Sequence, residues 1–169
     1  MELKEVLLKR RSIRKFKDQL VPDEYIDELL HAAMSGPSAC NRVPWEFYVI
    51  QNADLLKKLK STTLFTKIDA PLAIIVCGNL HKALPLKMAS YWIQDCSAAT
   101  ENILLRAVDL GLGSVWCGVH PQEKGEKKIR ELLNLDEKLI PLNIIFIGYP
   151  DQDPKPRDQY DEKKVHIIK

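Results

Sequence analysis

The sequence lacks the short spacings that mark metal and redox centres. Its cysteines are few and dispersed: Cys40, Cys77, Cys96 and Cys117. No two of them lie within four residues of each other, which excludes a CxxC motif. The four histidines are scattered as well, with no HxxxH pair. These absences argue against a structural zinc site, and we expect free thiols in a reducing compartment.

Long apolar runs and a strong net charge are also missing. The longest runs, 70–77 and 139–147, fall far short of the roughly 20 residues that cross a bilayer. A net charge of +2 gives little bulk attraction for nucleic acid. The first residues mix charge with leucine and contain no apolar signal-peptide core. We therefore expect a cytoplasmic protein that binds neither a membrane nor nucleic acid.

Internal repeats and low-complexity tracts are absent, and 169 residues suit one domain. We predict a single domain over 1–169, in which 151–169 forms a C-terminal arm because its first part is polar and carries two prolines.

Helices and strands alternate in the hydrophobic pattern, which favours α/β or α+β layering. The pattern predicts helices at 1–10, after Pro22, after Asn52, over 86–110 and after Pro121, and strands at 45–50, 70–77, 114–119, 142–147 and 165–168. Along 86–110, apolar residues recur at spacings of three and four and form a stripe on one helix face, and further apolar residues flank this stripe on both sides. This indicates a helix covered from more than one direction, either in the core or at a dimer seam.

A basic stretch over 10–16, with sequence RRSIRKF, precedes the first long amphipathic segment. Taken alone, such a stretch is either a solvated patch or an anion clamp for a phosphorylated cofactor. Arginine suits the second role because its planar fork of donors matches phosphate oxygens two at a time.

Three further segments have ordinary explanations when each is taken alone. The turn at 37–45 offers Ser and Asn at a rim, the glycine-rich stretch 111–118 can end a helix, and 155–157 resembles a solvated tail. Glycine also allows a flat ligand to approach the main chain closely. The order of these segments along the chain therefore matters more than any one of them.

Together and in this order, the segments resemble the nitroreductase family of FMN flavoproteins. The matching motifs are R-x-S-x-R-x-F at 10–16, P-S-x-x-N-x-x-P-W at 37–45, G-L-G-x-x-W-x-G at 111–118, I-G-Y-P at 147–150 and K-x-R at 155–157. The resemblance covers about residues 7–166. It implies an α+β, three-layer α-β-α fold with a central, mostly antiparallel sheet, strand exchange in a homodimer, and FMN sites at the interface. The segment 165–168 is the candidate for that exchange.

The resemblance also implies how the phosphate end of FMN is held. Arg10 and Ser12 would meet the phosphate and the ribityl chain, with Arg11 nearby. Lys155 and Arg157 would return to the phosphate from the C-terminal arm.

The flavin ring would have a second set of contacts. Arg14 would reach the pyrimidine edge and stabilise the reduced flavin electrostatically, which tunes its potential. The remaining contacts are Pro37, Ser38 and Asn41, with the Pro-Ser pair typically supplied by the other subunit, and the backbone of Trp116, Cys117 and Gly118 near the reactive N5. No catalytic protein acid, base or nucleophile is expected.

We therefore predict an FMN-dependent oxidoreductase that passes electrons from NAD(P)H to an electron-poor small molecule, such as a nitroaromatic or a quinone, in a ping-pong scheme. No separate dinucleotide motif distinguishes NADH from NADPH. The alternatives are enone reduction, dehalogenation or flavin fragmentation on the same fold, a flavin-binding or storage protein without efficient turnover, and a degenerate structural dimer.

The chain departs from the family pattern in places. Val43 precedes Pro44 where many relatives carry Gln, so one polar contact is missing. Cys117 is either a contact near N5 or simple packing, and packing is favoured because free cysteine behaves as a small hydrophobe. The short chain predicts an open pocket that Phe65, Tyr91 and Trp92 are candidates to line, although a core role suits Trp92 better.

Overall fold

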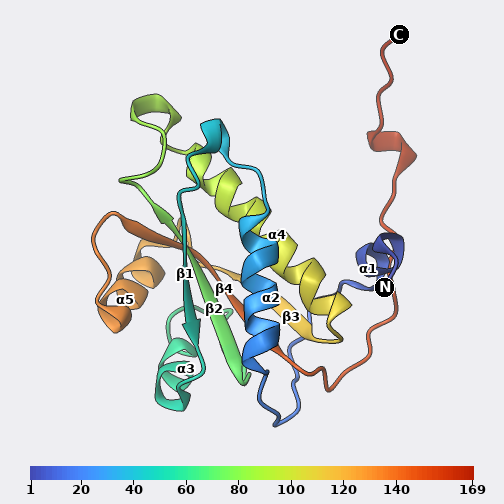
Figure 1. Cartoon of the computed structure of the whole chain (residues 1–169), viewed down its shortest axis with the longest axis horizontal. Coiled ribbons are helices and arrows are strands. Elements are labelled where there is room, and N and C mark those ends of the chain that lie inside the picture. Colours follow the sequence, from blue (N-terminus) through green and yellow to red (C-terminus); the bar gives the residue numbers. More distant parts are fainter.

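A four-stranded antiparallel sheet forms the middle of the computed structural model, which describes residues 1–169 (Figure 1). The strand order is β1-β2-β4-β3. The strands are β1 (Trp45–Ile50), β2 (Leu72–Asn79), β3 (Gly113–Gly118) and β4 (Leu139–Gly148). The only parallel element is an isolated bridge between Ser12 and Ser114. The mostly antiparallel sheet predicted from the sequence is therefore confirmed.

The two central strands differ slightly from their predicted bounds. β2 begins two residues later than expected and continues through Gly78, which pairs with Trp45. β4 begins at Leu139, three residues before the predicted start, and so includes Pro141. Pro141 has no N–H for the ladder, and it pairs with Cys77 beside a β-bulge, one of the few places where a central strand accepts proline.

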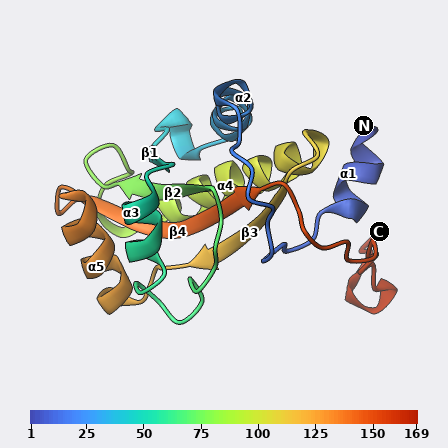
Figure 2. The same cartoon turned by 90° about the horizontal axis from the view of Figure 1, so that it is seen from below.

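One face of the sheet carries α2 (Asp23–Met34) and α4 (Tyr91–Asp109) (Figure 2). Acidic residues in the first turn of α2 suit the positive end of the helix dipole. Its residues Ile26, Leu29 and Ala33 are buried against α4 and the sheet. This face forms the larger of two hydrophobic clusters.

The central helix is shorter at its start than the predicted segment 86–110. Leu86–Met88 form a separate 3-10 turn, η2, and Leu86 has a φ of 56°. A left-handed residue cannot continue a right-handed α-helix, so α4 begins only at Tyr91. Trp92 and Ile103 are buried, and Met88, which the periodicity also includes, is half exposed. Even α4 is not long and apolar enough to cross a bilayer.

The opposite face carries α3 (Ala53–Leu59) and α5 (Glu123–Leu133). The Asn52 side chain accepts a hydrogen bond from Leu55 N at 3.0 Å, the predicted helix cap. Leu59 and Ile129 pack with Ile144 and Phe146 of β4 in the second cluster. Apolar residues thus cover both faces of β2 and β4, which confirms the three-layer architecture.

The two ends of the chain lie together beside β3 rather than in the sheet. α1 (Leu3–Lys9) packs on α4, and the C-terminal residues pass α1 and extend away from the body (Figures 1 and 2). Residues 165–168 form no strand within the single chain, contrary to the predicted strand. They are largely exposed, with Ile168 97% accessible, because no sheet edge of their own chain lies alongside them. The only regular structure in the arm is the 3-10 turn η3 (Glu162–Lys164).

Gly78 is required because of its contact with Trp92. A Cβ on Gly78 would lie 2.1 Å from Cε3 of the buried indole, whereas a Cβ on Gly118 would meet nothing within 4 Å. We predict that Gly78→Ala lowers the free energy of unfolding of the flavin-free protein by roughly 1–3 kcal/mol, because a packed ring must move. Gly118→Ala is the matched control, and urea unfolding compares the two. Equal stabilities would contradict the packing described for Trp92.

Candidate flavin site

The basic stretch and the C-terminal arm run side by side. Ile13 N donates to Ser114 O at 2.9 Å, which holds the stretch against β3. Arg157 N donates to Leu8 O at 3.2 Å, and the Arg11 guanidinium donates to Lys155 O. The structure therefore brings two segments together that are more than 140 residues apart in the chain.

Gln152 ties the arm to the stretch at a second point. Its side-chain Oε1 accepts hydrogen bonds from both Arg14 N and Lys15 N, each at 2.9 Å. Asp151 N donates to Lys15 O, and Phe16 forms a β-bridge with Pro150. Gln152 carries no sequence signal, because a lone glutamine in a polar loop is ordinary. Its role follows only from the fold.

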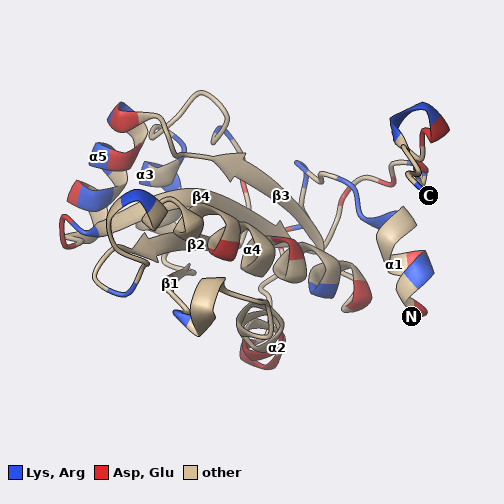
Figure 3. Ribbon diagram, turned by 90° about the horizontal axis from the view of Figure 1, so that it is seen from above, with Lys and Arg blue, Asp and Glu red and all other residues tan.

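The cations of these two segments form a positive region with one acidic partner. We call Arg10, Arg11, Arg14, Lys155 and Arg157 the cationic cluster. Figure 3 shows the basic chain between α1 and the sheet. Only one carboxylate lies within 4.0 Å of the cluster, Glu101 of α4, whose Oε1 is 3.6 Å from Arg10 Nε. Burial raises the pKa of Glu101, and the Arg10 charge partly opposes that rise.

Arg14 shares a cavity with the end of β3. The cavity measures about 320 Å³ and contains no acidic residue. Its lining includes four predicted site residues, Arg14, Trp116, Cys117 and Gly118. Beside Gly118 the space is open, since a Cβ there would meet nothing. A planar group could thus lie against the backbone of β3 and remain within reach of a fixed cation.

Cys117 is held as a neutral thiol at the wall of this cavity. Burial raises its pKa to about 11, although the Arg14 charge pulls it down. Its Sγ lies 3.3 Å from Phe65 O. The thiol therefore packs under the loop at 61–68 and is a poor nucleophile at neutral pH, in keeping with the packing interpretation.

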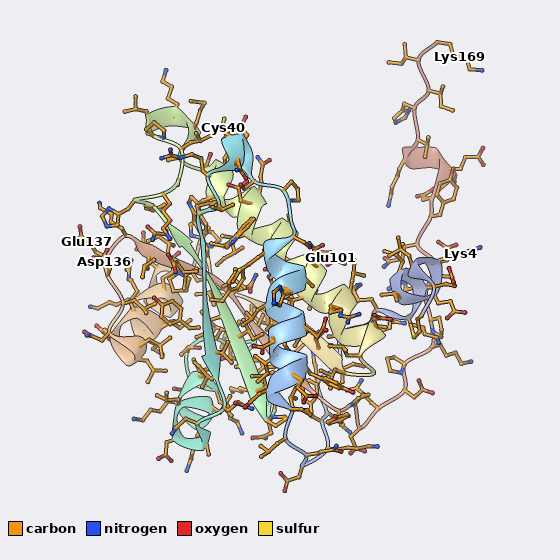
Figure 4. The ribbon with its side chains drawn as sticks, in the orientation of Figure 1. Lys4, Cys40, Glu101, Asp136, Glu137 and Lys169 are labelled. Carbon is orange, nitrogen blue, oxygen red and sulfur yellow. The ribbon has the colours of Figure 1, made fainter.

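The turn at 37–45 lies elsewhere in the same chain. It contains η1 (Ala39–Asn41), which sits beside the start of α4, where Ala39 N donates to Asp95 Oδ1 at 2.8 Å. Figure 4 labels Cys40 in η1, well separated from α1 and the arm. Pro37, Ser38 and Asn41 are absent from the lining of the Arg14 cavity. One chain therefore does not bring these residues to the cationic cluster.

The same turn is strained. Cys40, Asn41 and Val43 have φ values of 50°, 51° and 43°. A β-branched residue such as Val43 rarely adopts a positive φ, and such strain concentrates at binding sites. Ser38 Oγ accepts a hydrogen bond from Val43 N at 3.0 Å, which helps to hold the turn in this shape.

Four residues that line the cavity were not predicted from the sequence: Leu64, Lys67, Ile68 and Val115. They line it together with Phe65, which the sequence did suggest. Lys67 offers no pattern to detect, since it is a single lysine in a polar loop. Of the other suggested residues, Trp92 is buried in the core and Tyr91 is partly exposed at the start of α4, and neither lines this cavity.

An imidazole–carboxylate pair lies just beyond β3. His120 Nδ1 is 2.8 Å from Glu126 Oε1, and the ring packs edge-on against Trp92 with centroids 5.1 Å apart. Neither residue lines the Arg14 cavity. The pair satisfies a largely buried carboxylate, which gives it a structural role.

A larger cavity, about 580 Å³, lies at another place, beside α3. It contains none of the predicted site residues; its Lys60 is paired with Asp69, whereas its Lys17 and Lys57 have no carboxylate within 4.0 Å. Neither size nor an unpaired cation therefore identifies the site. The smaller cavity is the stronger candidate because it brings Arg14 and three further predicted site residues together beside an open stretch of backbone.

A family model matches most of the chain. The model of the nitroreductase family matches residues 7–68 and 60–149. A protein of Methanothermobacter thermautotrophicus, provisionally named NADH dehydrogenase/NAD(P)H nitroreductase, is 44% identical over all of this chain and 88% of its own length. The chain belongs to the nitroreductase family.

Solved structures agree with this assignment. An FMN-dependent nitroreductase of Clostridium difficile R20291 superposes with a TM-score of 0.88 at 36% identity, covering 97% of this chain and 98% of its own. A provisionally named nitroreductase of Desulfovibrio desulfuricans, solved in complex with FMN, has a TM-score of 0.84 at 26% identity over 100% of this chain and 98% of its own. The family and fold predicted from the sequence are confirmed.

The cysteines provide a direct check on this local structure. Cys40 is exposed, whereas burial raises the pKa of Cys96 to about 12 and that of Cys77 still further. We predict that iodoacetamide modifies one thiol per native chain at pH 8, because roughly one Cys117 side chain in a thousand is a thiolate there. Mass spectrometry should locate the label on Cys40, and Cys40→Ser should abolish it. Comparable labelling of Cys117 would contradict its placement under the loop.

Proposed function

We propose that the protein passes electrons from NAD(P)H through bound FMN to an electron-poor small molecule, a nitroaromatic or a quinone, in a ping-pong cycle. Its family makes it an FMN-dependent NAD(P)H oxidoreductase, as the sequence predicted. The acceptor and the kinetic scheme are the proposed part. The observation that carries the proposal is the unpaired Arg14 beside the open backbone of β3, next to the cationic cluster.

The cationic cluster fits the phosphate of FMN. Four of its five members have no carboxylate within 4.0 Å, so their charge is available for an anion. Arg10, Arg11 and Ser12 would meet the phosphate and ribityl chain, while Lys155 and Arg157 approach from the arm. Charge-assisted hydrogen bonds from guanidinium to phosphate are among the stronger polar contacts in proteins.

The cavity beside β3 fits the ring. Arg14 would hold its charge against the pyrimidine edge, and the backbone of Trp116, Cys117 and Gly118 would lie along the reactive edge. Bound FMN supplies the reversible hydride chemistry. The protein's part is to fix a positive charge where negative charge accumulates, and to offer a half-exposed aromatic surface, Trp116 and Phe65, to the incoming donor and acceptor.

A homodimer would complete the site. Pro37, Ser38 and Asn41 lie away from the cluster of their own chain, so they can contact the same flavin only from a partner subunit. Several surfaces of the single chain suit such a partner. Leu3 and Leu7 of α1 are exposed, as are the apolar residues of 165–168, and β1 is an edge strand with one unpaired side. We propose that 165–168 pairs with the partner's sheet.

Reduction of the flavin by NAD(P)H and its reoxidation by the acceptor would take place at the same binding site. NAD(P)H and the acceptor would bind in turn over the same face, in the cavity that Arg14 lines, which is the basis of the ping-pong scheme. A storage protein would hold the flavin equally well but would not exchange electrons with the donor. The discriminating property is therefore reduction of the bound flavin.

An anaerobic absorbance spectrum tests the proposal. The protein is loaded with FMN, desalted and scanned before and after NADH, then NADPH, and finally a nitroaromatic or quinone. We expect retained flavin absorption near about 450 nm that bleaches with a donor and returns with the acceptor. Flavin that stays bound but unbleached would favour the storage protein. Absence of retained flavin would contradict the site itself.

Arg14→Ala tests whether Arg14 tunes the flavin potential or only contributes to FMN affinity. Loss of a fixed positive charge beside the ring should lower the flavin potential and slow its reduction by NAD(P)H more than it weakens FMN affinity. Lys15→Ala is the matched control, because Lys15 is the adjacent cation and does not line the cavity. Redox titration and stopped-flow reduction measure the effect. A variant that loses only affinity would refute the assignment of Arg14.

Arg157→Ala tests the arm. Loss of one charge-assisted contact should weaken FMN binding by roughly 1.5–3 kcal/mol without changing the reduction rate of the loaded protein. Lys163→Ala, an exposed cation further along the arm, is the control. Isothermal titration of flavin-free protein gives both affinities. An unchanged affinity in Arg157→Ala would return the arm to the role of a solvated tail.

A further inference from the structure

Glu101 is the one acidic group set against the cationic cluster. It lies near the middle of α4, as Figure 4 shows, and its Oε1 is 3.6 Å from Arg10 Nε. The two side chains are 47% and 29% exposed. Arg11, Arg14, Lys155 and Arg157 have no such partner. A carboxylate therefore lies beside the guanidinium of Arg10, the first residue of the basic stretch.

This placement opposes the binding of a phosphate. An anion that contacts Arg10 would share one guanidinium with Glu101, and two negative charges a few ångströms apart repel. The 3.6 Å contact is longer than a hydrogen bond, so the two anions compete for the positive charge of Arg10 rather than for one of its N–H donors. Partial burial of both side chains weakens the screening of this repulsion by solvent.

We propose that Glu101 competes with the flavin phosphate for Arg10 and so holds FMN affinity below what the cationic cluster alone would give. The inference rests on the proposed flavin site and adds a residue that limits cofactor affinity. The competition acts only on a ligand that carries the phosphate. Riboflavin, which has the same ring without a phosphate, does not experience it.

A positioning role for Glu101 has the opposite consequence. If the carboxylate merely orients Arg10 for the phosphate, its removal would weaken FMN binding. The sign of the change in affinity therefore distinguishes competition from positioning. The comparison of FMN with riboflavin distinguishes both from a general effect on the fold.

The experiment measures the Kd of FMN and of riboflavin for full-length, flavin-free protein by fluorescence titration at fixed salt. The variants are Glu101→Gln, which removes the charge and keeps the shape, and Glu28→Gln as the matched control. Glu28 of α2 pairs with Arg106 of α4 at 2.8 Å, and neither forms an ion pair with a member of the cationic cluster. We expect Glu101→Gln to bind FMN roughly three- to tenfold tighter and riboflavin unchanged. Glu28→Gln should match the wild type for both flavins.

A double mutant localises the effect to Arg10. In an Arg10→Ala background, Glu101→Gln should tighten FMN binding less than in the wild type, because the share of the effect that comes from competition for the guanidinium is gone and only direct repulsion between the carboxylate and the phosphate is left. If Glu101→Gln does not fold, Glu101→Asp provides the second variant. Its shorter carboxylate lies further from Arg10 and should give a smaller tightening of FMN binding.

Three outcomes would overturn the proposal: weaker FMN binding by Glu101→Gln, unchanged binding, or equal tightening for FMN and riboflavin. A wild-type protein that binds riboflavin and FMN with equal affinity would also overturn it, because the phosphate would then contribute nothing. Failure of the wild type to bind either flavin would instead refute the proposed function.

Discussion

The hydrogen bonds between residues 8–17 and 149–157 are the constraint on which the site depends. They bring the C-terminal arm back across the basic stretch, which the hydrogen bond from Ile13 N to Ser114 O holds against β3. Without them, Lys155 and Arg157 would be a solvated tail and Arg14 would have no fixed position beside the cavity. Backbone and glutamine contacts do this work, so the side chains of Arg14 and Arg157 remain free for a ligand. The Arg11 guanidinium donates to Lys155 O, and the Arg10 guanidinium lies beside Glu101.

The charge balance of the site follows from this arrangement. A chain with a net charge of only +2 collects five cations in one region, and a single carboxylate lies within 4.0 Å of them. Such a concentration of like charge costs stability unless an anion neutralises it. The dianionic phosphate of FMN is suited to that role, and the family of the chain accounts for it. The strained turn at Cys40–Val43, which contacts nothing in this region of its own chain, fits the proposed contribution of a partner subunit.

Much of this architecture could be predicted from the sequence, and the failures have physical causes. The strand at Trp45–Ile50 and the cap at Asn52 follow local rules and were predicted correctly. The start of α4 was wrong because Leu86 adopts a left-handed conformation that hydrophobic spacing does not reveal. The strand at 165–168 is absent from the single chain because a strand needs a neighbour, and none is available within it.

In the candidate site, too, the sequence predicted some residues and missed others. Motif order pointed to the residues at each end of the chain, and the fold brings the two ends together. Gln152, Lys67 and Glu101 were not predicted, because each acts through a neighbour that is distant in sequence. For Cys117 the sequence left two roles open, a contact near the flavin N5 or simple packing. Burial raises its pKa and its thiol lies against the Phe65 carbonyl, and both observations favour packing.

A crystal structure of the protein with FMN bound tests the central claim most directly. The account predicts the phosphate against Arg10, Ser12, Lys155 and Arg157, the ring along Trp116–Gly118 with Arg14 at its pyrimidine edge, and Ser38 and Asn41 of a second subunit in contact with the same flavin. FMN bound in the larger cavity beside α3, or entirely within one chain without the turn at 37–45, would contradict it.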